Sequence, residues 1–388
     1  MKHYYVDLHI HIGRTLTGKP VKITASRSLT ISSIIQEASR RKGMDMIGII
    51  DGHVPEVLYE FERYIEAGEM VELGEGGLQY QNLTIILGSE IEIHDERCRG
   101  PIHVLVYFGK IEEMKQFSLW MASRMKNITL SSQRIYEQGT VLQEKVKELN
   151  GLFIPAHAFT PFKSLYGKGV RHSLAEVFNP SLIDGIELGL SANTAMAGGI
   201  EELKAYPFLS NSDAHSVAKI AREYQQMQMK SPSFVELEKV LKEKEGRKII
   251  ANYGLNPFLG KYYHTVCEKC FHKQPASPDW VCEQCGHHRF IRGVSERIKE
   301  IPQTDSPISR PPYVHQVPLD FIPGIGAKTL DKLIQFVGTE MYILHKASEE
   351  EMAEYVKPSI VRLILKARKG ELDIHTGGGG IYGKVMAD

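Results

Sequence analysis

Histidine and acidic residues recur in short clusters along the first 215 residues of the chain. The first cluster is Asp7-Leu8-His9-Ile10-His11, and the last is Asp213-Ala214-His215. Side chains two residues apart on a strand point to the same side, so His9 and His11 can converge on one cation, as can Asp213 and His215. The complete set of candidate metal ligands is His9, His11, Asp51, His53, Glu90, His103, His157, Asp213 and His215.

These side chains can bind more than one cation. Imidazole and carboxylate ligands suit zinc, manganese or iron, and magnesium is a further candidate. The set exceeds what one ion can take, so we expect two or three divalent ions, with Glu90 able to bridge. Two cations about 3.5–4 Å apart can acidify a bound water and stabilise the attacking and leaving oxygens of a hydrolysis. The sequence therefore predicts metal-dependent hydrolysis, with His9, His11, Glu90, Asp213 and His215 as the catalytic residues, and the family resemblance given below implies that the bond cleaved is a phosphoester.

Any single histidine in this set has a structural alternative. A buried histidine near the end of a strand is more often a hydrogen-bonded core residue than a ligand. The recurrence of independent clusters at strand ends favours the metal site. We expect Asp7 to orient a ligand histidine and not to bind metal itself.

Apolar runs of strand length carry these clusters. They alternate with helix-length segments, which predicts a parallel sheet closed into a distorted, seven-stranded α/β barrel. Most candidate ligands lie at the C-terminal end of their run, the edge where such barrels assemble sites. One helix is expected over Thr30–Lys42, capped by Ser28 or Thr30 and ended by Gly43. The expected strands are Tyr4–His9, Met46–Asp51, Leu83–Glu90, Ile102–Phe108, Leu152–His157, Gly185–Leu188 and Phe208–Asp213.

Four of the five cysteines form two CxxC pairs, Cys267/Cys270 and Cys282/Cys285. Two such pairs at this separation predict one structural zinc ion in a ribbon- or knuckle-like module. The module either binds nucleic acid or braces a domain junction. Cys98 stands alone, and we expect a spectator thiol.

Two loops that follow candidate ligands carry cations and no acid. The first contains Arg14, Lys19, Lys22 and Arg27, and the second contains Lys163, Lys168 and Arg171 among aromatic residues. Such loops suit a nucleic-acid backbone with a stacked or extruded base. The alternative is a loop that clamps a small phosphorylated substrate.

The segment Phe321-Ile322-Pro323-Gly324-Ile325-Gly326-Ala327-Lys328-Thr329 resembles a helix-hairpin-helix motif. In that motif the turn around Gly324 and Gly326 would expose backbone N–H groups at the start of a helix, where they bind a DNA phosphate without reading sequence. Lys328 and Thr329 would add contacts. An ordinary tight turn between helices is the alternative.

Composition limits the remaining choices. The 388 residues carry a formal net charge of zero, so DNA binding must come from local patches. No apolar run is long enough to span a membrane and no signal-peptide pattern precedes the first strand, so we expect a cytoplasmic protein without membrane partners. The expected segments are a barrel over 1–255, a zinc module over 256–298, a proline-rich surface linker over 299–318, a helical DNA-binding domain over 319–370 and a flexible glycine-rich tail over 371–388.

The ligand series resembles the motif series of the PHP (polymerase and histidinol phosphatase) superfamily. The resemblance implies a distorted seven-stranded barrel with a multinuclear metal centre. It further implies that His9, His11, Glu90 and Asp213 hold one ion, that Glu90, His103 and His157 hold a second, and that His215 with His53 or Asp51 contributes to a third. The chain departs from the family at Ile50-Asp51-Gly52-His53 and has no His, Asp or Glu between Ile12 and Gln36, which leaves the third position in question.

The order of barrel, zinc module, linker and helix-hairpin-helix resembles the endonuclease Q family of DNA-repair enzymes. That resemblance implies a cut 5′ to a deaminated base (uracil, hypoxanthine or xanthine) or an abasic site, in single- or double-stranded DNA. The alternatives are a small-molecule phosphatase of the histidinol-phosphate type and a non-catalytic DNA-binding scaffold. Protein partners are not predicted.

Overall fold

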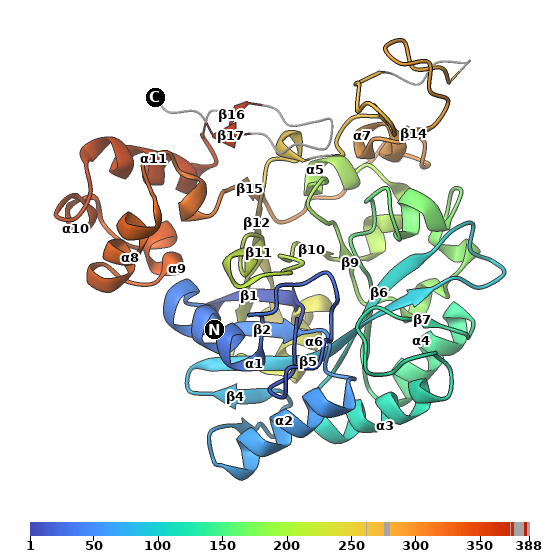
Figure 1. Cartoon of the computed structure of the whole chain (residues 1–388), viewed down its shortest axis with the longest axis horizontal. Coiled ribbons are helices and arrows are strands. Elements are labelled where there is room, and N and C mark those ends of the chain that lie inside the picture. Colours follow the sequence, from blue (N-terminus) through green and yellow to red (C-terminus); the bar gives the residue numbers. More distant parts are fainter. Residues whose placement is uncertain (261, 275–279, 373, 376–383, 386–388) are drawn as a thin grey trace.

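The computed structural model describes residues 1–388 apart from 261, 275–279, 373, 376–383 and 386–388. Its architecture is a mixed α/β fold, as the alternation of strand and helix patterns predicts. Within the described residues, no helix combines the length and the apolar character that crossing a bilayer requires. Figure 1 shows the strands surrounded by helices, with the C-terminal helices on one side and the segment that carries the four paired cysteines (the cysteine-rich segment, about 262–292) on another.

All seven expected strands form. In the order in which they neighbour one another they are β1 (Lys2–Ile10), β2 (Met46–Ile49), β5 (Leu83–Ile93), β6 (Ile102–Phe108), β8 (Leu152–Pro155), β9 (Ile186–Glu187) and β10 (Phe208–Leu209). Continuous ladders join β1 to β8 in this order, and β9 pairs with β10. Only isolated backbone hydrogen bonds are found among the described residues at the other two joints. Asp184 N to Phe153 O (3.0 Å) and Ala158 N to Glu187 O (2.8 Å) join the β8 and β9 segments, and His11 N to Ala214 O and Ala214 N to His9 O (both 3.1 Å) join the β10 and β1 segments. The ring of strands is therefore distorted at these two joints.

One strand contradicts the expected parallel arrangement. β6 runs antiparallel to both β5 and β8, whereas β1, β2 and β5 are parallel. The reason is a short connection over 94–101 that returns the chain without a crossover helix. The start of β6, which carries His103, consequently lies at the same edge as the ends of its neighbours.

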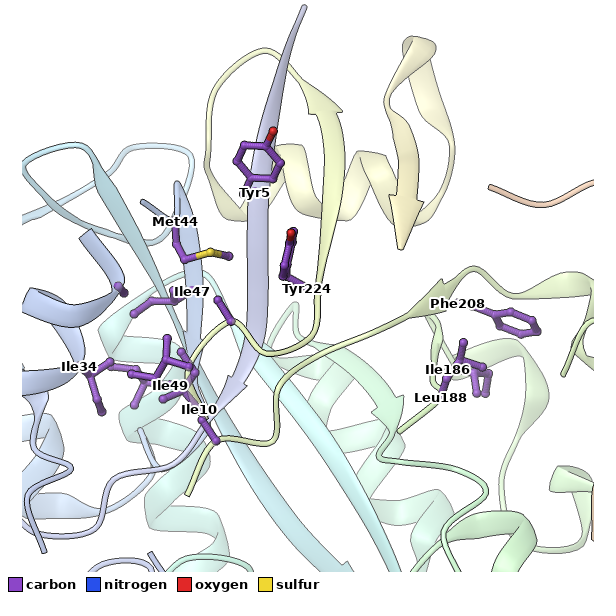
Figure 2. Close-up of a cluster of buried hydrophobic side chains, with 14 of the residues drawn as sticks. Tyr5, Ile10, Ile34, Met44, Ile47, Ile49, Ile186, Leu188, Phe208 and Tyr224 are labelled. Atoms are coloured by element: carbon purple, nitrogen blue, oxygen red, sulfur yellow. The ribbon is translucent and has the colours of Figure 1, made fainter. Parts of the chain in front are cut away.

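Side-chain alternation divides the core into two layers. On one face, Ile86 of β5, Leu105 of β6 and Ile154 of β8 pack with Leu237 of α6 (Phe234–Leu241). The other face packs against outer helices, and Figure 2 shows Ile47 and Ile49 of β2 facing Ile34. Glu90 and His103 share the parity of the first face, so the polar cluster sits above an apolar layer.

The helix after β1 begins and ends where the sequence predicts. Thr30 accepts a hydrogen bond from Ser33 N as the N-cap, and Gly43 ends the helix in the left-handed conformation at φ 78°. The helix is regular over α1 (Ile31–Gln36) and widens to a π-helix over Glu37–Lys42. The other barrel helices are α2 (Pro55–Glu66), α3 (Ile111–Ala122), α4 (Gly139–Glu148) and α5 (Thr194–Ala197).

Further strands widen the sheet beyond the expected seven. β11 (Tyr224–Met229) pairs with the first half of β1, and β12 (Lys248–Gly254) pairs with β11, both antiparallel. The prediction of a surface linker over 299–318 is wrong at β15 (Tyr313–His315), which pairs with β12 as a parallel edge strand. The prolines that flank β15 are compatible with an edge position, because an edge strand leaves some N–H groups unpaired. The same sheet also includes the short strands β3 (Val71–Glu72), which pairs with β4 (Leu78–Tyr80), and β7 (Arg134–Ile135), which pairs with β5. β13 (Val266–Cys267) and β14 (Phe290–Ile291) form a separate pair.

The C-terminal region is helical, as predicted. It contains α8 (Ala327–Phe336), α9 (Glu340–His345), α10 (Glu349–Ala353) and α11 (Pro358–Lys369), whereas α7 (Val294–Ile298) lies earlier, directly after the cysteine-rich segment. The expectation of an unstructured tail is wrong at β16 (Ile374–His375) and β17 (Lys384–Val385), which pair antiparallel. The glycine run over 376–383 lies outside the described residues.

Buried contacts fasten the C-terminal helices to the barrel. Lys42 Nζ lies 2.7 Å from Glu340 Oε1, with both side chains almost fully buried. His345 stacks on Tyr5 at 4.6 Å and lies 2.7 Å from the hydroxyl of Tyr224. The helical region is therefore packed on the strands and is not a tethered appendage.

We expect Glu340→Leu to lower the free energy of unfolding by about 3–5 kcal/mol, because it leaves the Lys42 ammonium buried without a partner. Lys42→Met combined with Glu340→Leu should recover most of that loss. Arg41→Gln, which breaks the neighbouring exposed pair with Asp331, is the control and should cost less than about 1 kcal/mol. Urea denaturation measures all of these, and a double variant as unstable as Glu340→Leu would contradict the expectation.

Candidate metal centre

Glu90 lies at the centre of the polar cluster. It belongs to β5 and is 2% exposed. Its Oε1 lies 2.9 Å from His103 Nδ1 and 3.2 Å from His157 Nε2, and its Oε2 lies 3.0 Å from Lys22 Nζ. The hydroxyl of Ser132 also donates to Oε2. One carboxylate thus joins side chains from several parts of the chain.

Three groups of potential ligand atoms share members around this carboxylate. In each group the ligand atoms all lie within 4.8 Å of one another. Glu90 belongs to two groups and His11 to two, so the groups are contiguous. They are His9, His11 and Glu90; Glu90, His103 and His157; and His11, Asp213 and His215.

His9 and His11 are oriented by acids behind them. His9 Nδ1 lies 3.0 Å from Glu187 Oε1, and His11 Nδ1 lies 3.3 Å from Asp51 Oδ2. Both Nε2 atoms are buried and have no hydrogen-bond partner among the described residues. They point to Asp213 Oδ1, at 3.3 Å from His9 and 3.6 Å from His11. Two unpartnered buried nitrogens beside carboxylates fit divalent cations, because an ion would satisfy both.

Burial and neighbouring charges together shift the pKa values of these groups. Burial lowers the pKa of His9, but the carboxylates of Glu187, Asp213 and Glu90 raise it to about 10. Burial and the Lys22 ammonium lower the pKa of His11 to about 4. Burial would raise the pKa of Glu90, yet His103 and Lys22 hold it well below its usual range. The cluster therefore has anionic carboxylates that attract cations, and cation binding must displace the proton of His9.

Asp51 and His53 lie differently from the sequence-based expectation, because neither belongs to a ligand group among the described residues. Asp51 Oδ2 accepts from Ile12 N at 2.6 Å and supports His11 from behind. His53 turns away to Ser89 and the carbonyl of Leu130. His215 instead groups with His11 and Asp213, because Ala214 pairs with β1 and brings that loop over the cluster.

Asp7 supports the loop that carries Asp213, and not a histidine ring. Its carboxylate accepts from the backbone N–H of Ser212 at 3.0 Å and of Ala221 at 2.9 Å. A weaker bond at 3.4 Å reaches the backbone N–H of His9. The expected orienting role therefore acts through the main chain.

Glu187 is the functional residue that the sequence reasoning missed. It is buried on β9, where it accepts from His157 N at 2.8 Å and from Asn211 at 2.8 Å in addition to His9. The available signal was an acid inside the predicted apolar run Gly185–Leu188, where an unpaired carboxylate would be costly. No local spacing links it to His9, which is 178 positions away.

Two members of the groups occupy strained backbone. His157 has φ 30° and Asp213 has φ 45°, the region that favours glycine. Each follows the end of its strand, β8 or β10. The turn directs both side chains toward the cluster.

The four paired cysteines converge. Cys267 Sγ lies 3.6 Å from Cys285 Sγ, and Cys270 Sγ lies 3.5 Å from Cys282 Sγ. The two pairs form matching turns, with Cys267 N donating to His272 O and Cys282 N donating to His287 O. This four-cysteine cluster has the donor set of a structural zinc site. Cys98 is apart, and burial raises the pKa of its thiol to about 12, which suits a spectator.

Several cations expected to bind DNA pair with acidic side chains of the chain itself, Lys22 in the buried cluster and Lys19 and Lys163 at the surface. Lys22 is held by Glu90 in the cluster, Lys19 pairs with Glu56 at 3.0 Å, and Lys163 pairs with Glu92 at 2.8 Å. The loops contain no acid, but neighbouring elements supply one, which a scan along the sequence cannot reveal. Arg14 donates to the carbonyl of Gly18 within its own loop. Arg27, Lys168 and Arg171 are exposed.

A tight turn with glycines at 324 and 326 precedes α8. Gly324 has φ 88°, and Gly326 precedes the first helical residue with open space around it. A hollow of about 780 Å³ beside this turn is lined by Lys328, Thr329 and also by Lys357, at the start of α11. Contact of Gly324, Gly326, Lys328 and Thr329 with DNA stays a prediction.

Comparison with known proteins places the chain. No family model matches it. It is 56% identical over 387 residues to the uncharacterized protein YqxK of Bacillus subtilis, covering 99% of this chain and 100% of the other. The lesion-specific endonuclease Q of Pyrococcus furiosus superposes with a TM-score of 0.85 at 30% identity, over 99% of this chain and 95% of that one.

The chain belongs to the endonuclease Q family. A second solved structure is endonuclease Q in complex with a 27-mer duplex substrate that has an abasic lesion at the active site. It superposes with a TM-score of 0.84 at 30% identity, over 100% of this chain and 97% of that one. Likeness to endonuclease Q therefore extends over the barrel, the four-cysteine cluster and the C-terminal helices together.

We expect Glu187→Gln to weaken divalent-ion binding about 10–100-fold, because a neutral amide no longer orients and polarises His9. Titration of metal-depleted protein with manganese, followed by metal analysis, measures this. Glu223→Gln replaces another buried acid that contacts none of the candidate ligands by hydrogen bond, and is the control. Equal affinities for Glu187→Gln and the control would refute the orienting role.

Cys282→Ser is expected to remove one zinc ion per chain and leave the metal content of the barrel cluster unchanged. The reason is that a structural site of four thiolates loses most of its affinity with one ligand. Cys98→Ser is the matched control and should retain every ion. Zinc loss in both variants, or in neither, would contradict the assignment of the four-cysteine cluster.

Proposed function

We propose that this protein is a metal-dependent DNA-repair endonuclease that hydrolyses the phosphodiester 5′ to a deaminated base or an abasic site. The observation that carries the proposal is the likeness to endonuclease Q over almost the whole chain, combined with the contiguous ligand groups around Glu90. A phosphatase of small molecules would need the barrel alone. The proposal gives the four-cysteine cluster and the C-terminal helices a role in holding DNA.

The residues that would hold the ions are His9, His11, Glu90, His103, His157, Asp213 and His215. Bound divalent ions would supply an acidified water and would stabilise negative charge on the phosphate. Glu187 and Asp51 fix the two imidazoles so that their Nε2 atoms face inward. Lys22, held 3.0 Å from Glu90, adds a positive charge beside the carboxylate, where an anionic phosphate would approach.

The opening of the cluster lies near Asp213 and His215. Their side chains are 29% and 33% exposed, whereas those of His9 and His11 are fully buried. Arg222 holds this edge by donating to the carbonyl of Ser212 at 2.6 Å and of Asp213 at 3.2 Å. A phosphodiester would thus reach the cluster from the side of the 213–215 loop.

The proposed DNA contacts at α8 rest on the exposed turn. Its backbone N–H groups and Lys328 suit a phosphate without base recognition. The buried attachment of α9 to the barrel holds this turn in a fixed place relative to the cluster. We propose that it binds the duplex away from the cut.

The test is an end-labelled duplex that contains one uracil, assayed beside the undamaged duplex and a phosphomonoester. We expect a nick 5′ to the uracil that a chelator abolishes. Asp213→Asn should reduce cutting at least about 100-fold while the Kd for the duplex changes less than about threefold, because it removes a ligand charge and no phosphate contact. Asp305→Asn, at an exposed position, is the control.

Preferential turnover of the monoester would overturn the proposal in favour of a phosphatase. Tight DNA binding without cutting under added manganese or zinc would indicate a scaffold. If Asp213→Asn lost binding and cutting equally, the residue would be structural.

A further inference from the structure

Three separate segments of the chain place basic side chains around one hollow of about 490 Å³. Arg99 comes from the loop between β5 and β6, and Lys168 and Arg171 come from the loop after β8. Arg292 and Arg297 come from the end of the cysteine-rich segment and from α7. We refer to the surface formed by Arg99, Lys168, Arg171, His172, Arg292 and Arg297 as the basic hollow.

Hydrogen bonds to backbone carbonyls hold together the three segments that carry these like charges. Arg297 donates to the carbonyls of Tyr166 at 2.6 Å, Arg171 at 2.7 Å and Val170 at 3.1 Å. The backbone N–H of Arg99 donates to Gly169 O at 2.9 Å. The three segments are therefore fixed to one another, although their side chains repel.

The repulsion is only partly neutralised inside the protein. The one acid that lines the basic hollow is Glu300, which pairs with Arg292 and with Arg297. Arg99, Lys168 and Arg171 are exposed, and within the described residues none of their side chains forms an ion pair, although the backbone N–H of Arg171 donates to the Glu176 carboxylate at 2.8 Å. Lys19, Lys22 and Lys163 in contrast each have an acid. Burial, together with Arg292 and Arg99, lowers the pKa of Arg297, and Glu176 opposes that shift only in part.

The position of the basic hollow connects it with the metal centre. Arg99 lies four positions before His103, and the loop that carries Lys168 follows His157. Two walls of the basic hollow are therefore formed by chain segments adjacent to candidate metal ligands. The third wall belongs to α7, which follows the four-cysteine cluster in the chain. A polyanion that passes from the metal centre over these loops would meet it.

We infer that the basic hollow binds the phosphate backbone of the DNA that flanks the cut, with the cysteine-rich segment and α7 supplying one wall. The inference deepens the proposed function and rests on it for the identity of the polyanion. Guanidinium groups from separate segments suit successive phosphates, because each can bind phosphate oxygens in a bidentate manner. Such contacts position the duplex and read no base.

The test measures binding of an undamaged duplex of about 30 base pairs across a salt series, so that no cutting is required. We expect Arg99→Gln/Lys168→Gln/Arg171→Gln to reduce the magnitude of the negative slope of log K (the association constant) against log salt by about 2–3, since each lost phosphate contact removes about 0.9. The Kd at moderate salt should rise at least about tenfold. Arg40→Gln/Lys2→Gln/Lys248→Gln, with the same change in charge at exposed positions elsewhere, should leave the slope within about 0.5 of the wild-type value.

A slope equal to that of the control variant would overturn the inference. The metal content of each variant serves as the check of folding. If the triple variant fails that check, Lys168→Gln alone replaces it and is expected to reduce the magnitude of the slope by about 0.9. The two proposals fail separately. If the wild-type protein cuts no lesion but the triple variant shows the reduced slope, the proposed cleavage is refuted and DNA binding at the basic hollow is supported. If the wild-type protein cuts but the slope of the triple variant is unchanged, DNA binding at the basic hollow alone is refuted.

Discussion

The site depends on one buried carboxylate. Glu90 is removed from water, which disfavours its charge, and it stays anionic because Lys22 and surrounding imidazoles compensate. A buried anion of this kind is stable only while its partners remain in place. Each partner comes from a different element, so the strands must hold their order for the carboxylate to be tolerated. The order of the strands and the negative charge of Glu90 therefore depend on each other.

The strands meet that constraint by their alternation. Alternate side chains of β5, β6 and β8 form an apolar layer beneath Glu90 and His103, which leaves the polar groups at one edge. Behind the histidines a second set of acids, Glu187 and Asp51, fixes the ring orientations. Backbone N–H groups saturate Asp7 in the same region, so that acid holds a loop and is not available to a cation. Four acids of similar burial thus divide three tasks: Glu90 groups with the histidines, Glu187 and Asp51 orient imidazoles, and Asp7 holds a loop.

The sequence was sufficient for what depends on local pattern. The seven strands, the capped helix, the paired cysteines and most candidate ligands follow from spacing and periodicity. What it could not supply depends on partners far along the chain. The reversal of β6, the edge strand β15, the role of Glu187 and the acids opposite Lys19 and Lys163 are all set by contacts between distant segments. Periodicity defines which face a side chain is on, but not which element lies opposite.

The left-handed backbone at His157 and Asp213 has a consequence for attempts to stabilise this protein. Each such position costs of the order of 1–3 kcal/mol that glycine or asparagine would largely avoid. Selection for stability alone would therefore favour glycine or asparagine at both positions. A variant stabilised without regard to activity would lose candidate metal ligands first at the turns after β8 and β10.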